Sequence, residues 1–218
     1  SRPGTVGRPL EGVEFRIVTP EGVEVPERDT ETPGELRIHR PVVMSGYLGL
    51  PEAGAAAFDD DGWLRTGDVG TVTNDGFMTL YDRARDVIRS GGEWIYSVQL
   101  ENLIMSDELV VEAAVIGYPD KQWVERPLAV TVLAEGASPT IETAERLRAS
   151  MRKELPSWML PEYWTFVKSI DKTSVGKFDK KDLRTHLAEG DYNIIRLKGP
   201  GESQRLAATE ATDLSREN

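Results

Sequence analysis

Several features are missing from this sequence of 218 residues, and each absence excludes a class of protein or site. It has no cysteine, which excludes disulfides and thiolate-metal sites, and we expect a cytoplasmic protein. No apolar run approaches the roughly 20 residues that a membrane-spanning helix needs, and we also expect no signal peptide. Its two histidines, His39 and His186, lie far apart without ligand-like spacing, so we expect no metal site.

Positive charge is scarce, because 37 acidic residues outnumber 26 basic ones and give a net charge of −11. Residues 1–82 hold 15 acids and 7 bases, a balance of −8, whereas residues 83–190 hold 17 acids and 15 bases, a balance of −2. An acidic chain repels nucleic-acid phosphates, so we expect no nucleic-acid partner. The nearly neutral middle part is where a polyanionic nucleotide is best tolerated.

Residues 1–82 read as β-rich. The alternation of apolar and polar residues that is typical of half-buried strands recurs in three segments, at residues 13–18, 34–40 and 77–81. Turn sequences such as Pro-Glu-Gly and Asn-Asp-Gly punctuate this part of the chain. Short strands joined by turns predict a small distorted β-barrel.

Residues 83–190 alternate between expected strands and helices, which predicts a small α+β domain. The predicted strands cover residues 110–118, 128–134 and 163–170, and the predicted helices cover residues 97–105, 140–155 and 180–188. Ser97 and Thr140 are the predicted N-caps of the first two helices. From residue 191 the sequence becomes polar and loses its periodicity, so we expect residues 191–218 to form a flexible tail.

Residues 63–101 gather three kinds of group that a bound nucleotide needs. Asp68, in a Thr-Gly-Asp turn, offers a carboxylate for ribose hydroxyls, and Gly91 and Gly92 let backbone approach a ligand closely. Three arginines offer donors for phosphate oxygens: Arg83, Arg85 and Arg89. Each group also has a plainer explanation. Asp68 is then an Asx-turn residue, the two glycines form an ordinary turn, and the arginines are solvated surface charges.

Four segments in this order resemble the adenylate-forming superfamily of acyl-CoA synthetase and luciferase-like enzymes. They are PGELRIHRPVVMSGYL (Pro33–Leu48), DGWLRTGDVG (Asp61–Gly70), DRARDVIRSGGEWIYSVQLE (Asp82–Glu101) and TSVGKFDKKDLR (Thr173–Arg184). Within the superfamily they are most similar to medium- and long-chain fatty acyl-CoA ligases, and the resemblance covers roughly residues 1–190. The sequence departs from the usual pattern at Asp82, where the family has glycine, and in the lead-in at residues 170–173.

The resemblance implies a nucleotide-binding set around the ribose turn. Asp68 accepts hydrogen bonds from both ribose hydroxyls, and Arg83 faces the ribose or a phosphate. Arg85 occupies the hinge position between two domains and, with Arg89, completes the cationic group. Trp94 either stacks on the adenine or packs under the loop that precedes it.

The resemblance also implies residues for the two chemical steps. Gly91, Gly92 and Glu93 line the channel for the pantetheine arm of CoA. Lys177 is the catalytic lysine, whose ammonium is suited to the charge that develops when a carboxylate attacks the α-phosphate of ATP. The plainer interpretation of Lys177 is one more cation on a solvated basic face.

The resemblance divides the chain into three parts. Residues 1–82 are expected to form the last, β-barrel subdomain of a large AMP-binding domain, residues 83–190 a small mobile α+β lid domain, and residues 191–218 the tail. The family's Ser/Thr/Gly-rich phosphate loop and its Mg²⁺-binding glutamate have no counterpart in this sequence. We therefore expect a C-terminal fragment that does not catalyse the complete reaction by itself.

The implied reaction is ATP-dependent activation of a fatty or similar carboxylic acid to an acyl adenylate, followed by transfer to CoA. Mg²⁺ would be held by residues outside this sequence. Two alternatives stay open: an acyl-AMP ligase or carrier-loading adenylation domain, and a non-catalytic interaction module. Acyl chain length and oligomeric state cannot be read from these residues.

Overall fold

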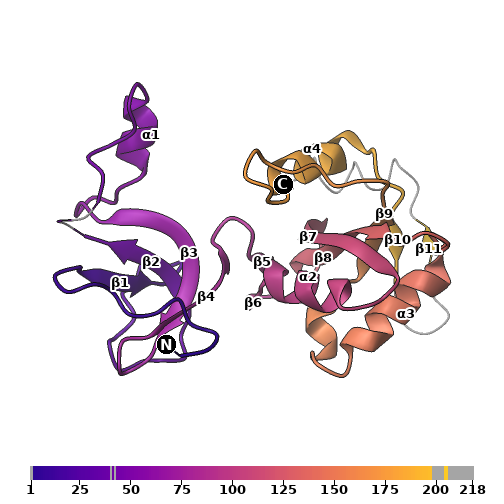
Figure 1. The fold of residues 1–218 in the computed structure, drawn as a ribbon, viewed down its shortest axis with the longest axis horizontal. Helices are drawn as coiled ribbons and strands as arrows, with labels where there is room; N and C mark the ends of the chain where they lie inside the picture. The colour runs from indigo at the N-terminus through magenta and orange to yellow at the C-terminus, as the bar shows by residue number, and fades with distance from the viewer. Residues whose placement is uncertain (1, 40, 42, 198–203, 206–218) are drawn as a thin grey trace. The chain divides into compact units, whose positions relative to one another are not determined.

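The computed structural model describes residues 2–39, 41, 43–197 and 204–205, and it divides into two compact units, Ser1–Arg85 and Asp86–Asn218 (Figure 1). The division falls close to the boundary expected between residues 82 and 83. Each unit has its own sheet and its own hydrophobic core. None of the helices within the described ranges has the length and apolar character needed to span a bilayer.

The first unit contains one antiparallel sheet of four strands in the order β1-β2-β3-β4. Its elements are β1 (Phe15–Val18), β2 (Gly34–Ile38), the short helix α1 (Pro51–Ala56), β3 (Leu64–Val72) and β4 (Met78–Arg83). The sheet is open, since no pairing between β1 and β4 occurs among the described residues. Instead, Gly7 pairs with Met78 on the free edge of β4. The Met78 N–H donates a hydrogen bond to the Gly7 carbonyl at 2.9 Å. The expected small distorted β-barrel is thus an open four-stranded sheet among the described residues.

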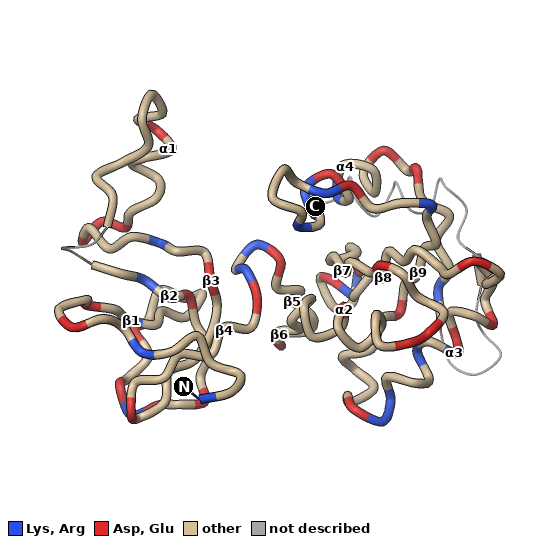
Figure 2. Tube along the Cα trace, in the orientation of Figure 1, with Lys and Arg blue, Asp and Glu red and all other residues tan. Residues whose placement is uncertain are grey.

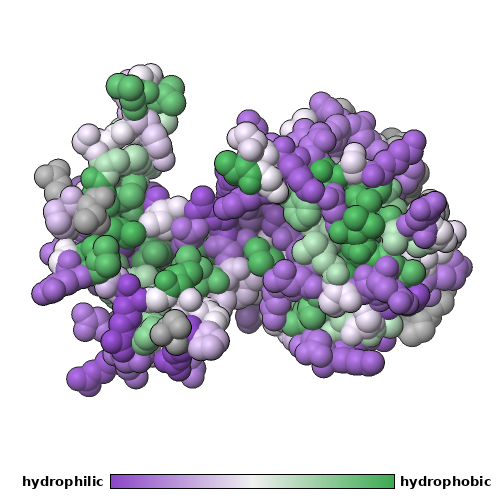
Figure 3. Space-filling view, viewed as in Figure 1, coloured by the Kyte–Doolittle hydropathy of each residue, from purple (hydrophilic) through white to green (hydrophobic). Residues whose placement is uncertain are grey.

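The core of the first unit is small. Ile17, Leu36 and Met78 are its buried members, and four partly buried apolar side chains pack against them. Leu48 and Leu50, just before α1, are 102% and 60% exposed, and apolar surface is visible on the unit that carries α1 (Figure 3). This unit thus leaves apolar side chains without cover from the described residues.

The second unit contains a larger mixed sheet, in the order β11-β10-β9-β8-β5-β6 with β7 also paired to β8. Its strands are β5 (Ile88–Ser90), β6 (Glu93–Ile95), β7 (Val110–Asp120), β8 (Val124–Leu133), β9 (Tyr163–Phe166), β10 (Ile195–Arg196) and β11 (Gln204–Arg205). Its helices are α2 (Ser97–Met105), α3 (Ile141–Met151), the 3-10 helix η1 (Ser157–Met159) and α4 (Lys180–Glu189). The predicted α+β class is confirmed.

Helices cover both faces of this sheet (Figure 1). On one face Ala113 and Val115 of β7 belong to a core that includes residues of α2 and α3. On the other face Ala114 and Ile116 belong to a core with residues of α4. Because successive side chains of a strand point to opposite faces, a strand covered on both sides reads as a continuous apolar run, which is what residues 113–116 show.

The structure confirms one predicted cap and corrects the other. The Thr140 side chain accepts a hydrogen bond from the Thr143 N–H at 3.2 Å, as an N-cap does. Ser97 is the first residue of α2 rather than its cap, and Tyr96 occupies the cap position without a side-chain bond to the helix. The Ser97 hydroxyl is buried and instead accepts a hydrogen bond from the Lys180 ammonium at 2.6 Å.

The expected flexible tail is wrong for residues 191–197. Tyr192, Ile194, Ile195 and Leu197 are all buried, and Ile195 pairs with Trp164 in the sheet. The apolar side chains in this short segment complete both cores of the second unit. Of the remaining tail, only residues 204 and 205 lie within the described ranges, where they form β11.

Candidate functional site

The predicted ribose turn lies within β3 of the first unit. Asp68 faces Arg83 of the neighbouring strand β4, and their side chains form an ion pair at 2.6 Å between Oδ1 and Nη1. The same nitrogen donates to the Thr66 carbonyl at 3.0 Å. Asp68 and Arg83 are 32% and 51% exposed, so both groups are open to solvent and to a ligand. The structure thus brings together a carboxylate and a guanidinium predicted to bind one nucleotide.

Two glycines shape the strand around this ion pair. Gly67 has a φ of +71°, a left-handed conformation that favours glycine. At Gly70 an added Cβ would lie 2.1 Å from the Thr79 carbonyl oxygen, so the two strands approach too closely for any side chain. The pairing register shifts between Val69 and Gly70. Such a bulge changes the direction of nearby side chains, here that of Asp68, from the one they have in a regular strand.

A buried carboxylate supports the same strand from the other end. Asp59 is 7% exposed and accepts hydrogen bonds from Arg16 at 2.6 Å and Arg37 at 2.7 Å. It also accepts a bond from the Trp63 N–H at 2.9 Å, just before β3. Burial by itself raises the pKa of Asp59, but the bond from Trp63 and the two guanidinium groups outweigh it and lower the pKa to about 2. No periodic pattern in the sequence predicted this cluster.

The expected hinge segment carries charges of both signs between Asp82 and Arg89 (Figure 2). The division between the two units falls directly after Arg85, an exposed residue in a turn. Asp86, the next residue, is buried and forms an ion pair with Arg184 of α4 at 2.7 Å. This pair anchors the start of the second unit.

The Gly-Gly loop joins the short strands β5 and β6 of the second unit. Gly91 and Gly92 have φ values of +63° and +88°, and both are exposed. Above Gly91 lies the ring of Trp123, whose Cε3 would be only 2.6 Å from an added Cβ. The Gly91 N–H donates to the Trp123 carbonyl at 2.9 Å. Nothing lies within 4 Å of an added Cβ at Gly92.

The other predicted residues of this loop point to its surface. Glu93 and Arg89 are exposed, and Trp94, half-buried, pairs with Arg89 across the two strands. The Arg89 N–H donates to the Glu125 carboxylate at 3.0 Å. Both interpretations of Trp94, stacking on a base and packing under the loop, stay predictions.

A cleft of about 380 Å³ opens beside the Gly-Gly loop. Its lining residues are Ser90, Gly91, Glu93, Trp123, Arg126 and Trp158. The two tryptophans are 43% and 44% exposed, which is unusual for so large an apolar side chain. Sequence reasoning missed Trp123, Arg126 and Trp158, although an arginine at the start of the apolar run of β8 was a usable signal. A larger hollow of about 470 Å³ in the first unit contains none of the predicted site residues.

Lys177 lies in a tight turn before α4. The Thr173 N–H donates to the Lys177 carbonyl at 2.7 Å, and Gly176 adopts a φ of +80°. Lys172 and Phe178 pair across the base of the turn. Lys177 is exposed, and its ammonium makes no hydrogen bond or ion pair with the residues that the structure describes. The turn therefore presents a cation to solvent on a fixed backbone.

A buried ion pair links the elements that follow the two loops. Lys180, at the start of α4, contacts Glu101 of α2 at 2.7 Å and the Ser97 hydroxyl at 2.6 Å. Glu101 also accepts a hydrogen bond from the Val115 N–H at 2.8 Å. Both charged side chains are about one-tenth exposed, at 11% and 9%. This ion pair therefore links α4, which follows the lysine turn, to α2, which follows the Gly-Gly loop.

Carboxylates surround one of the two histidines. The His186 ring lies 2.7 Å from Asp191 and 3.4 Å from Asp182, and the bond to Asp191 raises the pKa of His186 above its usual range. Among the described residues, His186, Glu189 and Asp191 have ligand atoms close enough to hold one cation. This surface group has no contact with the predicted site residues.

Comparison with known proteins places this geometry in a family. Residues 99–177 match the AMP-binding enzyme C-terminal domain. The chain is 42% identical over 178 residues to 3-methylmercaptopropionyl-CoA ligase of Ruegeria pomeroyi, a match that covers 82% of this chain and 32% of that protein. It is also 42% identical over 180 residues to long-chain-fatty-acid–CoA ligase of Thermus thermophilus, with the same coverage.

A solved structure gives the same result for the fold. The o-succinylbenzoate CoA synthetase of Bacillus subtilis, in complex with an acyl-adenylate intermediate, is 31% identical with a TM-score of 0.71, and the match covers 83% of this chain and 35% of that one. The second unit therefore contains an AMP-binding enzyme C-terminal domain. The chain belongs to the adenylate-forming enzymes, and the two curated relatives named above are acyl-CoA ligases. It spans about a third of the length of the curated relatives it matches.

Proposed function

We propose that this chain is the C-terminal part of an ATP-dependent acid–CoA ligase. The first unit would be the last subdomain of the large AMP-binding domain, and the second unit would be the mobile lid. The observation that carries the proposal is that the second unit carries two different exposed groups on one rigid set of packed elements. One is the exposed ammonium of Lys177, and the other is the Gly-Gly loop with its cleft.

In the first half-reaction, a carboxylate attacks the α-phosphate of ATP and pyrophosphate leaves. Negative charge moves onto the phosphate oxygens, and a positioned cation stabilises it. Lys177 supplies that cation, while Asp68 accepts hydrogen bonds from the ribose hydroxyls and Arg83 donates to the ribose or phosphate. The ion pair between Asp68 and Arg83 holds both side chains ready for the nucleotide. Mg²⁺ would be held by residues outside this chain.

In the second half-reaction, the thiol of CoA attacks the acyl carbonyl and AMP leaves. The lid would turn about Arg85, which withdraws Lys177 and brings the Gly-Gly loop to the adenylate, a hinge movement of known type. Gly91, Gly92 and Glu93 would then border the path of the pantetheine arm. The exposed backbone at Gly92, with nothing within 4 Å of an added Cβ, leaves room for such an arm.

We infer a fatty or similar aliphatic acid as the substrate. The two curated relatives named above are equally similar to this chain, yet one is a ligase for a long-chain fatty acid and the other for 3-methylmercaptopropionate. Both names describe an acid with an aliphatic chain. A panel of acids of increasing length, tested on the full-length protein by release of pyrophosphate, would decide between them.

The test of the function separates the two half-reactions in the full-length protein. Lys177→Ala should lower the rate of adenylate formation by on the order of 10²–10³ and leave thioester formation from supplied acyl-AMP nearly unchanged. Lys181→Ala is the matched control, because Lys181 is another exposed lysine four residues away. Equal loss of both half-reactions would remove Lys177 from this role.

The acceptor needs a separate measurement. Wild-type protein loaded with acyl-AMP should release AMP when CoA is added and should not do so with a phosphopantetheinyl carrier protein. Release with the carrier alone would favour a carrier-loading domain. No transfer to either acceptor would favour an acyl-AMP ligase, and no adenylate at all a non-catalytic module.

A further inference from the structure

Arg126 is a buried charge that the proposed chemistry does not use. Its side chain is 8% exposed, although arginine is rarely buried unless it is paired and hydrogen-bonded. It lies in β8, where the following residues, from Leu128 to Val130, are fully buried. A planar guanidinium offers five N–H donors in a fixed geometry, so its partners define its position closely.

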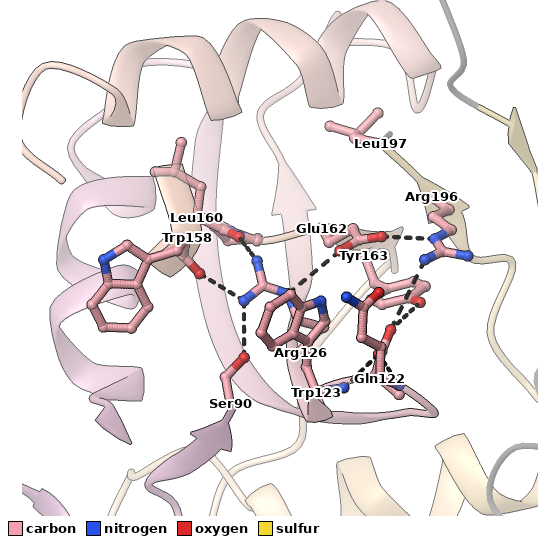
Figure 4. Close-up of polar contacts among 12 residues, drawn as sticks. Ser90, Gln122, Trp123, Arg126, Trp158, Leu160, Glu162, Tyr163, Arg196 and Leu197 are labelled. Atoms are coloured by element: carbon pink, nitrogen blue, oxygen red, sulfur yellow. Dashed lines mark hydrogen bonds and ion pairs between the residues drawn. The ribbon is translucent and has the colours of Figure 1, made fainter. Parts of the chain in front are cut away.

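The partners of Arg126 come from three separate segments (Figure 4). Nη1 donates to the Ser90 hydroxyl at 2.9 Å and to the Trp158 carbonyl at 2.6 Å. Nη2 donates to the Leu160 carbonyl at 3.4 Å, and Nε faces the Glu162 carboxylate at 3.4 Å. One side chain therefore joins the end of β5, the 3-10 helix and the segment before β9.

Two of these partners are walls of the cleft beside the Gly-Gly loop. Ser90 directly precedes Gly91, and Trp158 also lines the cleft. The third wall, Trp123, is held separately, since its N–H donates to Asp120 at 2.9 Å and its carbonyl accepts from Gly91.

Backbone strain marks the same rim. Val124, next to Trp123 and paired with Ser90, has a φ of +71°, which is a genuine outlier for a β-branched residue. Such strain amounts to about 1–3 kcal/mol and persists only where the surrounding structure imposes it, typically at functional sites. The contacts of Arg126 and Trp123 therefore hold the residues that line the cleft in place.

We propose that Arg126 is a positioning residue for the acceptor step: it sets the distance between the Gly-Gly loop and Trp158 so that the cleft accepts the thiol-bearing substrate. This rests on the proposed function. A bound group is well placed only if the walls keep their spacing, and a displacement of 1 Å can lower a rate by about 10²-fold. Without Arg126, Ser90 and two backbone carbonyls lose their donor, and Trp158 is free to shift.

The experiment uses the full-length protein with Arg126→Gln and Arg126→Lys. We expect Arg126→Gln to raise the KM for CoA by between about tenfold and about 100-fold, while the KM for ATP and the rate of adenylate formation change less than about twofold. Arg126→Lys keeps the charge but cannot reach all partners with one ammonium, so its KM for CoA should be intermediate. Arg146→Gln is the control, because Arg146 is 51% exposed and pairs with Asp107 and Glu108, away from the cleft lining.

Each outcome decides the matter. An unchanged KM for CoA in Arg126→Gln, or equal loss in both half-reactions, overturns the positioning role. If Arg126→Gln fails to fold, Arg126→Lys alone carries the test, and a wild-type KM for CoA in that variant overturns the proposal. If the wild-type protein does not use CoA at all, the proposed function fails instead, which is a different result.

Discussion

Gly91 and Gly92 form a matched pair that isolates the contact with Trp123. Both have positive φ, so alanine at either position adopts a left-handed conformation that costs roughly 1–2 kcal/mol. Only at Gly91 does an added Cβ meet a neighbour, at 2.6 Å from Cε3 and 2.9 Å from Cζ3 of Trp123. Because carbon atoms pack at about 3.5–4.0 Å, the indole ring has to move by roughly 1 Å.

The consequences of this movement differ for stability and for function. The Trp123 ring is 43% exposed and has solvent to move into, so the added overpacking should stay near the low end of the usual range of about 1–3 kcal/mol. The cleft wall, however, is displaced by a distance that can lower a rate by about 10²-fold. Gly91→Ala should therefore raise the KM for CoA far more than Gly92→Ala does.

The assay combines urea denaturation with half-reaction kinetics on the full-length protein. We expect both variants to lose stability, Gly91→Ala by about 1 kcal/mol more than Gly92→Ala. Adenylate formation should be nearly unchanged in both. If the two alanine variants show the same KM for CoA, the contact with Trp123 has no part in acceptor binding, and the reasoning fails.

Two further predictions concern buried carboxylates. Glu101→Gln leaves the Lys180 charge buried without its partner, so it should lower the free energy of unfolding by about 3–5 kcal/mol in denaturation. Glu112→Gln breaks a more exposed pair with Lys172 and should lower it by about 0–1 kcal/mol. Equal losses in the two variants would contradict the burial argument. The pKa of Asp59 is about 2 in the folded protein, against an ordinary value of 3.8 in an unfolded chain. Ionised Asp59 therefore adds about 2 kcal/mol of stability above pH 3.8, and this contribution is lost as the pH falls from 3.8 through 2. Acid titration of unfolding should show this slope in the wild-type protein and in Asp61→Asn, and an unchanged slope in Asp59→Asn would refute it.

Long periodic segments were predictable from the sequence, and short or glycine-rich ones were not. The helix at α3 and its Thr140 cap were predicted because apolar residues recur at helical spacing after a capping residue. Strand β3 was treated as a turn, since Gly67 and Gly70 interrupt its pattern, yet Asp68 lies within it. Strands β5 and β6 have three residues each, too few for any period to appear.

In the candidate site, too, residues in local motifs were predictable, whereas residues brought together by long-range contacts were not. Asp68, Arg83, the two glycines and Lys177 were predicted from short local segments that resemble family motifs, and their roles stay predictions. Arg126 and Trp158 were missed because the cleft they form depends on contacts between β8 and the 3-10 helix, residues far apart in sequence. Ser97 was assigned to a cap, but its partner Lys180 lies 83 positions away, and no local rule predicts that bond. The short buried segment at residues 191–197 was too brief to outweigh its polar neighbours.

The pairing of Glu101 with Lys180 sets a limit on grafting this module into a relative. A chimera with its junction anywhere between those two positions would inherit one half of a buried charge pair and depend on the host for the other. The core also needs Ile195 and Leu197, so a cut made soon after α4 would leave an apolar hole. The natural block for exchange runs from Asp86 to Leu197, and it transfers the lysine turn and the Gly-Gly loop together.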